Sequence, residues 1–149
     1  MEKRVLNDYS IGEKFVTPAR TITESDFVLW SALVGDWTPL HTDAEYMKKS
    51  IFGERIAHGF IAFNVSTGLA ARLGPYVYTP KELLGFEGWQ DVRFTAPVKI
   101  GDTIHVELTV KDLKPKDKDR GILTYETKII NQREEMVMIG TQRLLVKLS

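Results

Sequence analysis

Residues 59–73 form the segment that most restricts how this chain can fold. They read GFIAFNVSTGLAARL and contain no charged side chain before Arg72. A helix that is apolar on nearly all sides is buried, because its surface would otherwise face water. The Gly74-Pro75 step then ends the helix. We therefore predict a buried central helix on the order of 20 Å long, at 1.5 Å per residue.

The second half of the chain shows the alternation of β-strands. Ile104, Val106, Leu108 and Val110 alternate with polar residues, which is typical of a half-buried strand. One buried helix followed by antiparallel strands predicts an α+β fold in which the sheet curls around the helix. Besides the strand around Val106, strands are predicted over 85–96, 122–130 and 136–148, with a weaker one over 13–22.

Two shorter helices are predicted before the central one. Thr23 can cap a helix with apolar residues at helical spacing, and Gly35 suits the residue just past its end. Asp43 can cap the second helix, and we prefer this role to that of a metal ligand. Between them, Pro39 fixes its own φ and keeps Thr38 out of helical geometry. The segment joining the two helices is therefore predicted to be stiff and bent.

Length and composition define a broad class. A chain of 149 residues fits one domain, residues 1–149, with a core of its own. Twenty basic side chains balance twenty acidic ones, which gives no support for a nucleic-acid partner. No cysteine is present, so disulfides, thiol nucleophiles and thiolate metal sites are excluded. There is neither a secretory signal nor a long apolar run, so we expect a soluble cytoplasmic protein without membrane association.

Asp36 and His41 are the candidate catalytic side chains. They lie on either side of the bent segment, so they can converge on one point, where a carboxylate and an imidazole can hold and deprotonate water. At the start of the buried helix, the N–H of Gly59 can stabilise an oxygen that gains negative charge. The preceding helix end favours a more basic Asp36, whereas His41 opposes this, so the direction of the pKa shift stays open.

The blocks that contain these residues resemble the MaoC-like, or (R)-specific enoyl-CoA hydratase, family. The family pattern Asp-x-Asn-Pro-(Leu/Ile)-His is similar to residues 36–41, except that Thr38 replaces the asparagine. An Ala-His-Gly step follows at 57–59, and residues 94–103 resemble the family's strand and turn. The resemblance implies a hot-dog fold, an antiparallel sheet wrapped around a long central helix. It also implies a homodimer or a dimer of dimers.

The implied activity is that of a hydratase or dehydratase. It would interconvert a trans-2-enoyl thioester, most simply of coenzyme A, and an (R)-3-hydroxyacyl thioester, without a cofactor or a metal. Asp36 and His41 would act on the water molecule. Pro39, His58 and Asn64 are predicted as substrate-binding residues. The Asn64 amide either faces the acyl pocket or bonds to a neighbouring loop, and the His58 ring holds the turn before the helix.

Two alternatives stay open at this stage. The same scaffold can carry a thioesterase, in which a carboxylate activates water at the thioester carbonyl, since a fold does not fix the reaction. Thr38 in place of asparagine also keeps open a non-catalytic subunit that binds an acyl thioester.

Overall fold

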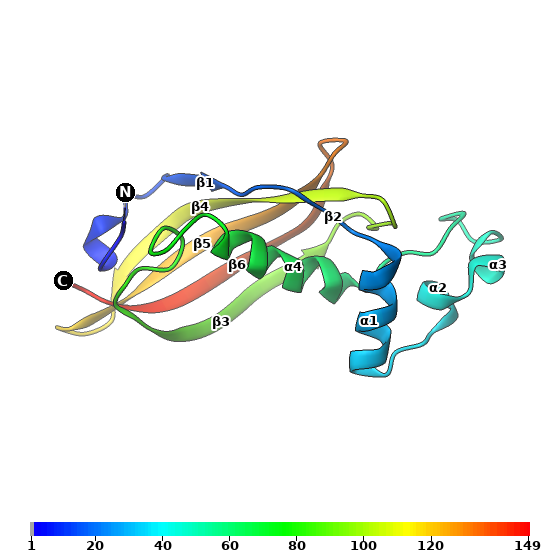
Figure 1. Ribbon diagram of the computed structural model, residues 1–149. Helices are drawn as coiled ribbons and strands as arrows, with labels where there is room; N and C mark the ends of the chain where they lie inside the picture. Colours follow the sequence, from blue (N-terminus) through cyan, green and yellow to red (C-terminus); the bar gives the residue numbers. More distant parts are fainter. Residues whose placement is uncertain (1) are drawn as a thin grey trace.

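The computed structural model describes residues 2–149, and its largest element is one antiparallel sheet of six strands. The strand order is β1-β4-β5-β6-β3, and the short β2 also pairs with β4 (Figure 1). The long strands lie where the alternation of apolar and polar residues predicts them. The bounds are β1 Lys14–Val16, β2 Arg20–Thr21, β3 Leu83–Phe94, β4 Thr103–Pro115, β5 Arg120–Asn131 and β6 Met136–Lys147.

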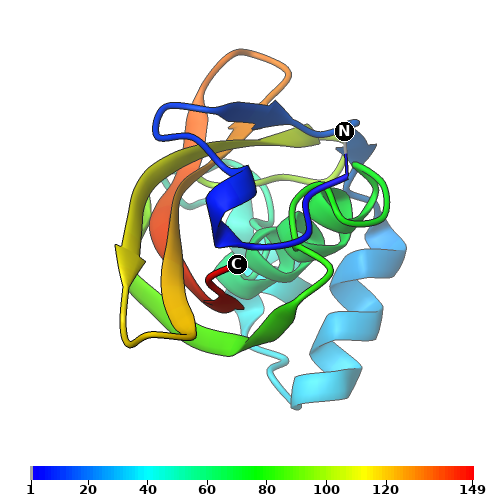
Figure 2. The same ribbon diagram turned by 90° about the vertical axis from the view of Figure 1, so that its left-hand side faces the viewer.

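Helix α4, Gly59–Ala71, lies inside the curl of this sheet. Figure 2, which looks along the helix, shows the strands bending around it. The helix packs on β4 and β5, whose inward side chains include the buried Val106, Leu108 and Ile129. The predicted arrangement of an α+β fold with a sheet wrapped around a central helix is therefore confirmed. The buried residues of the helix are Ile61, Ala62, Ser66, Leu69 and Ala70.

The prediction that α4 is buried on all sides is wrong for a single chain. Asn64, Thr67 and Gly68 are exposed, and 57% of the Phe60 side chain is accessible. The reason is geometric: the sheet covers one side of the helix, and the opposite side remains open. The helix is therefore mostly apolar on both sides, although one side is exposed in the single chain.

Three further helices precede α4. They are α1 Glu24–Val34, α2 Pro39–Thr42 and α3 Ala44–Met47, and a 3-10 turn spans Leu6–Asp8. The caps predicted for two of them are confirmed. Thr23 precedes α1, Gly35 ends it with φ 74°, and the Asp43 carboxylate accepts the Tyr46 N–H at 2.8 Å at the start of α3. Figures 1 and 2 show α1 beside the open side of α4.

Pro39 does more than stiffen the segment before α3. Thr38 is extended, with ψ 138°, as expected for a residue before proline. The residues from Pro39 onward then form the single helical turn α2, which was not predicted. Proline suits the first position of a helix because its missing N–H would have no partner there. Within residues 2–149, no helix is long and apolar enough to span a bilayer.

Candidate active site

Asp36, His41 and His58 meet where three elements come together. Asp36 follows α1, His41 lies on α2, and His58 caps the start of α4. Oδ2 of Asp36 is 3.8 Å from Nε2 of His41 and 3.4 Å from Nε2 of His58. The structure thus brings together the predicted pair Asp36 and His41, and it adds His58 to the same oxygen.

The backbone fixes which nitrogen of His41 carries the proton. Nδ1 lies 2.7 Å from the carbonyl oxygen of Ile56, which can only accept, so Nδ1 is the donor. In the neutral ring Nε2 then has a free lone pair, and it faces the Asp36 carboxylate. Two acceptors cannot hydrogen-bond to each other directly, and these two lie 3.8 Å apart. Their spacing suits a water molecule that donates to both.

His58 has the opposite tautomer. Its Nε2 lies 3.1 Å from the carbonyl oxygen of Asp36, so Nε2 carries the proton and points toward the same carboxylate. Burial lowers the pKa of His58, although the bond to Asp36 acts against this shift, and the ring is neutral at pH 7. Its buried Nδ1 has no hydrogen-bond partner among residues 2–149.

The two imidazole rings are stacked, with centroids 3.6 Å apart and planes 24° from parallel. This geometry bears on whether the cluster binds a metal, since the ligand atoms of Asp36, His41 and His58 lie within 4.8 Å of one another. An imidazole binds a metal in its own plane at about 2.0–2.1 Å. Two nearly parallel planes this far apart cannot share such an ion. The cluster fits proton transfer better than metal binding.

Thr38 stabilises the ionised form of Asp36. Oδ1 of the carboxylate accepts the Thr38 hydroxyl at 2.5 Å and the Thr38 N–H at 3.1 Å. These two hydrogen bonds lower the pKa of Asp36, and any charge on His58 or His41 acts in the same direction. The direction left open by the sequence is therefore downward. Asp36 is ionised at neutral pH, with 41% of its side chain exposed.

A mostly apolar cavity of about 400 Å³ begins at this cluster. Both histidines and Gly59 line it, together with apolar side chains from α4 and the sheet. As the first residue of α4, Gly59 has an N–H without an intrahelical acceptor. A Cβ at Gly59 would lie 3.0 Å from the Phe94 ring, so a larger residue here would make the ring move, and glycine fits without a shift. Other lining residues are Phe52, Ala62, Val98 and Val137.

Pro39 and Asn64, predicted to bind substrate, do not line this cavity. Pro39 is exposed at the start of α2, where it shapes the backbone. Asn64 was expected to face the acyl pocket, but it lies on the open side of α4, beside a shallow groove against α1. Its Nδ2 donates to the Phe60 carbonyl at 2.8 Å. The helical phase explains this: Ile61 and Ala62 face the sheet, and residue 64 points away from it.

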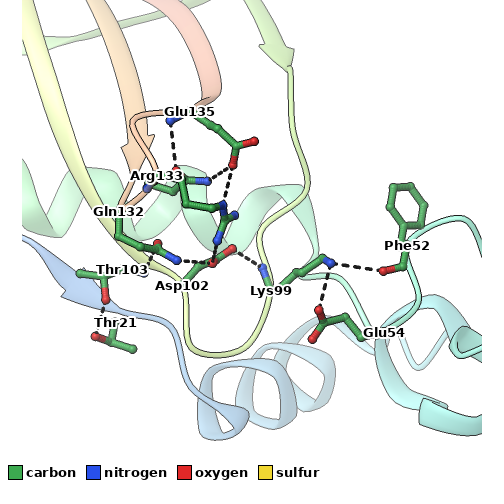
Figure 3. A network of polar contacts seen from close by, with 10 residues as sticks. Thr21, Phe52, Glu54, Lys99, Asp102, Thr103, Gln132, Arg133 and Glu135 are labelled. Atoms are coloured by element: carbon green, nitrogen blue, oxygen red, sulfur yellow. Dashed lines mark hydrogen bonds and ion pairs between the residues drawn. The ribbon is translucent and has the colours of Figure 1, made fainter.

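Sequence reasoning did not assign Lys99, which fixes one wall of the cavity. Its Nζ donates to the Phe52 carbonyl at 3.2 Å and pairs with the Glu54 carboxylate at 2.9 Å (Figure 3). The Ala57 N–H also bonds to the carbonyl of Val98 at 2.7 Å. These contacts fasten the loop that carries Phe52 to the end of the sheet. Lysine is common on protein surfaces, so its presence in the sequence does not predict this role.

Residues 7–131 match the sequence profile of the MaoC like domain. The chain is 35% identical over 127 residues to the (R)-specific enoyl-CoA hydratase of Rhodospirillum rubrum, covering 81% of this chain and 82% of that protein. It therefore belongs to the MaoC-like family.

Two further comparisons concern length and structure. Protein MaoC of Klebsiella aerogenes is 36% identical over 109 residues, which cover 73% of this chain but only 31% of that longer protein. A monoamine oxidase regulatory protein from Archaeoglobus fulgidus has a TM-score of 0.91 at 34% identity, covering 100% of this chain and 97% of that one.

The fold is the hot-dog fold. A Mycobacterium tuberculosis protein described as a double hot-dog fold has a TM-score of 0.81 at 19% identity, with 99% of this chain and 45% of that chain covered. The likeness at this level of identity concerns the fold alone.

Proposed function

We propose that this chain is a hydratase or dehydratase that interconverts a trans-2-enoyl thioester, most simply of coenzyme A, and an (R)-3-hydroxyacyl thioester. One observation carries the proposal: the carboxylate of Asp36 and the free Nε2 of His41 face each other at 3.8 Å, beside a cavity that includes Gly59. The names of its relatives, including the (R)-specific enoyl-CoA hydratase, support the same activity.

The arrangement suits addition of water to the β-carbon. The thioester oxygen would accept the Gly59 N–H at the start of α4, where the helix dipole favours developing negative charge. A water molecule held between Asp36 and His41 would attack the β-carbon while Asp36 takes its proton. Asp36 then delivers this proton to the α-carbon, so that H and OH of one water molecule are added and the carboxylate is restored, and the same steps in reverse remove water. The acyl chain would lie along the apolar wall beyond Gly59.

The experiment follows the loss of enoyl-CoA absorbance with crotonyl, longer and branched enoyl thioesters. We expect Asp36→Asn and His41→Ala each to lower the rate about a hundredfold or more, the usual size of general acid–base effects. Asp43→Asn is the matched control, because this neighbouring carboxylate caps α3 and does not line the cavity. An Asp36→Asn variant as active as the wild type contradicts the proposal.

Two further measurements, of thiol release and of acyl-CoA binding, separate the alternatives. A thioesterase releases free thiol from a saturated acyl-CoA, which a hydratase does not. A non-catalytic subunit binds acyl-CoA tightly across chain lengths without turnover. The acceptor nitrogen of His41 beside Asp36 favours the hydratase, because it gives the attacking water a second hydrogen-bond acceptor.

We also infer that the chain works as a homodimer. Strand β3 lies at one edge of the sheet, and its side chains Leu84, Phe86 and Phe94 are exposed. Phe94 contacts Phe60 on the open side of α4, with ring centroids 6.0 Å apart. An unpaired strand edge next to an uncovered apolar helix is suited to pairing with a second copy. A cytoplasmic location and a single domain remain predictions.

A further inference from the structure

Thr38 stands where the family pattern has asparagine, and it contacts the carboxylate of Asp36 directly. Both donors of this residue, the hydroxyl and the backbone N–H, reach the same oxygen, Oδ1. The other oxygen, Oδ2, therefore faces Nε2 of His58 and of His41, at 3.4 and 3.8 Å. The two carboxylate oxygens thus have different environments, one fixed by the turn and one directed toward the two rings.

Asp36 needs such support because little else restrains it. It follows Gly35, whose left-handed conformation ends α1, and its side chain is 41% exposed. An exposed carboxylate in a turn rotates freely, and water competes for both oxygens. Thr38 has an extended backbone, as expected for a residue before Pro39. In this conformation its hydroxyl and its N–H both reach the same carboxylate oxygen.

We propose that Thr38 is a positioning residue for the reaction: its hydroxyl and N–H hold Oδ1 of Asp36, so that Oδ2 stays directed at the water site beside His41. This inference rests on the proposed hydratase function. It explains how the site keeps its geometry with threonine in the asparagine position. Neither Thr38 nor Asp36 is part of the cavity wall, but Oδ2 of Asp36 is directed at the two histidines that line it. Both donors of Thr38 are bonded to Asp36, so Thr38 acts through this carboxylate.

The two effects of the Thr38 hydroxyl on rate have opposite signs. Its hydrogen bond lowers the pKa of Asp36, which makes the carboxylate a weaker base. If proton affinity dominated, removing the hydroxyl would raise the rate. If orientation dominates, removing it lowers the rate, because a small misplacement of a catalytic group costs up to about a hundredfold.

The test compares Thr38→Val, which keeps the shape and removes the hydroxyl, with Thr38→Ser, which restores a hydroxyl. We expect Thr38→Val to lower kcat at least about tenfold with little change in KM, and Thr38→Ser to recover most of this loss. Thr42→Val is the control. The Thr42 hydroxyl bonds to the carbonyls of Trp37 and Thr38, so it supports the same turn without touching Asp36.

Two kinetic outcomes would overturn the proposal. One is a Thr38→Val variant with wild-type or higher kcat. The other is an equal loss of kcat in Thr42→Val, which would mean that only the stability of the turn matters.

A second readout does not depend on activity. In a carboxyl-carbon NMR titration, Thr38→Val should raise the pKa of Asp36, while Thr42→Val should leave it unchanged. The titratable groups that act on Asp36 are His58 and His41, and both are present in each variant. An unchanged Asp36 titration in Thr38→Val rejects the positioning role even if the wild type turns over no thioester. Failure of the proposed function and failure of this inference are therefore distinguishable.

Discussion

The two histidines of the site have different tasks because the backbone gives them opposite tautomers. The Ile56 carbonyl places the His41 proton on Nδ1, and the Asp36 carbonyl places the His58 proton on Nε2. His41 thus presents an acceptor to water, whereas His58 donates to the backbone carbonyl of Asp36 and lies 3.4 Å from its carboxylate. A charge on His41 would lower the pKa of the stacked His58 ring, whose centroid is 3.6 Å away. The two rings therefore offer opposite hydrogen-bonding groups to the site.

Ala62 lines the cavity that we propose for the acyl chain. It is buried on the inward side of α4. We predict that Ala62→Leu lowers kcat/KM for long enoyl thioesters at least about tenfold more than for crotonyl-CoA, since a single methylene in a pocket is worth 10-fold or more. Rates measured across a series of chain lengths check this.

Ala71→Leu provides the control for Ala62→Leu, because Ala71 lies on the same helix but is exposed and does not line the cavity. Equal losses for short and long substrates in Ala62→Leu would contradict the assigned path of the chain.

Local pattern predicted some site residues and missed others for identifiable reasons. Asp36, His41 and Gly59 lie in short turns and helix starts, whose geometry depends on nearby residues such as Pro39. The strands that complete the cavity are different. Val137 faces inward next to the buried Met138 because a register shift interrupts β6, and simple alternation does not predict such a bulge.

At the level of elements, the turns at one end of the sheet are tied together by Asp102. Its carboxylate accepts the Lys99 N–H at 2.9 Å, Nε2 of Gln132 at 2.8 Å and Nη1 of Arg133 at 2.9 Å (Figure 3). These bonds join the turn before β4 to the turn between β5 and β6. They also hold Lys99, which in turn fastens the loop carrying Phe52. The wall of the cavity therefore depends on a network outside the site.

Because of this network, the free energy of unfolding depends on pH in the acid range. Burial alone would raise the pKa of Asp102, but the hydrogen bonds from Arg133, Gln132 and Lys99 outweigh it and lower the pKa. Because the folded-state pKa lies below the unfolded value of about 3.9, the stabilisation is complete above that pH. It is lost as the pH falls through the folded-state value.

We predict that Asp102→Asn lowers the free energy of unfolding by about 1–2 kcal/mol at pH 7, as expected for lost hydrogen bonds to a charged group. The difference from the wild type should shrink below about pH 4. Urea denaturation at several pH values measures both. Asp119→Asn, in the exposed β4–β5 turn, is the control. A difference that stays constant from neutral to acid pH would exclude a role for the ionised carboxylate.

At the level of the whole molecule, the sheet covers only one side of its central helix. The single chain leaves the outer side of α4 and the edge strand β3 without a partner, and α1 adds the exposed Leu29 and Leu33 nearby. An apolar sequence over residues 59–71 therefore has two causes. Half of it faces the sheet, and we infer that the other half faces a second copy.

The last prediction concerns this second copy. In light scattering at micromolar concentration, the wild type should have twice the chain mass of 17.0 kDa. Phe86, 52% exposed on β3, should tolerate lysine in the folded chain, but a charge on an edge strand opposes pairing. Phe86→Lys should thus shift the mass toward the monomer, whereas Tyr46→Lys, at an equally exposed aromatic on α3, should not. A wild type that is monomeric under these conditions would refute the dimer.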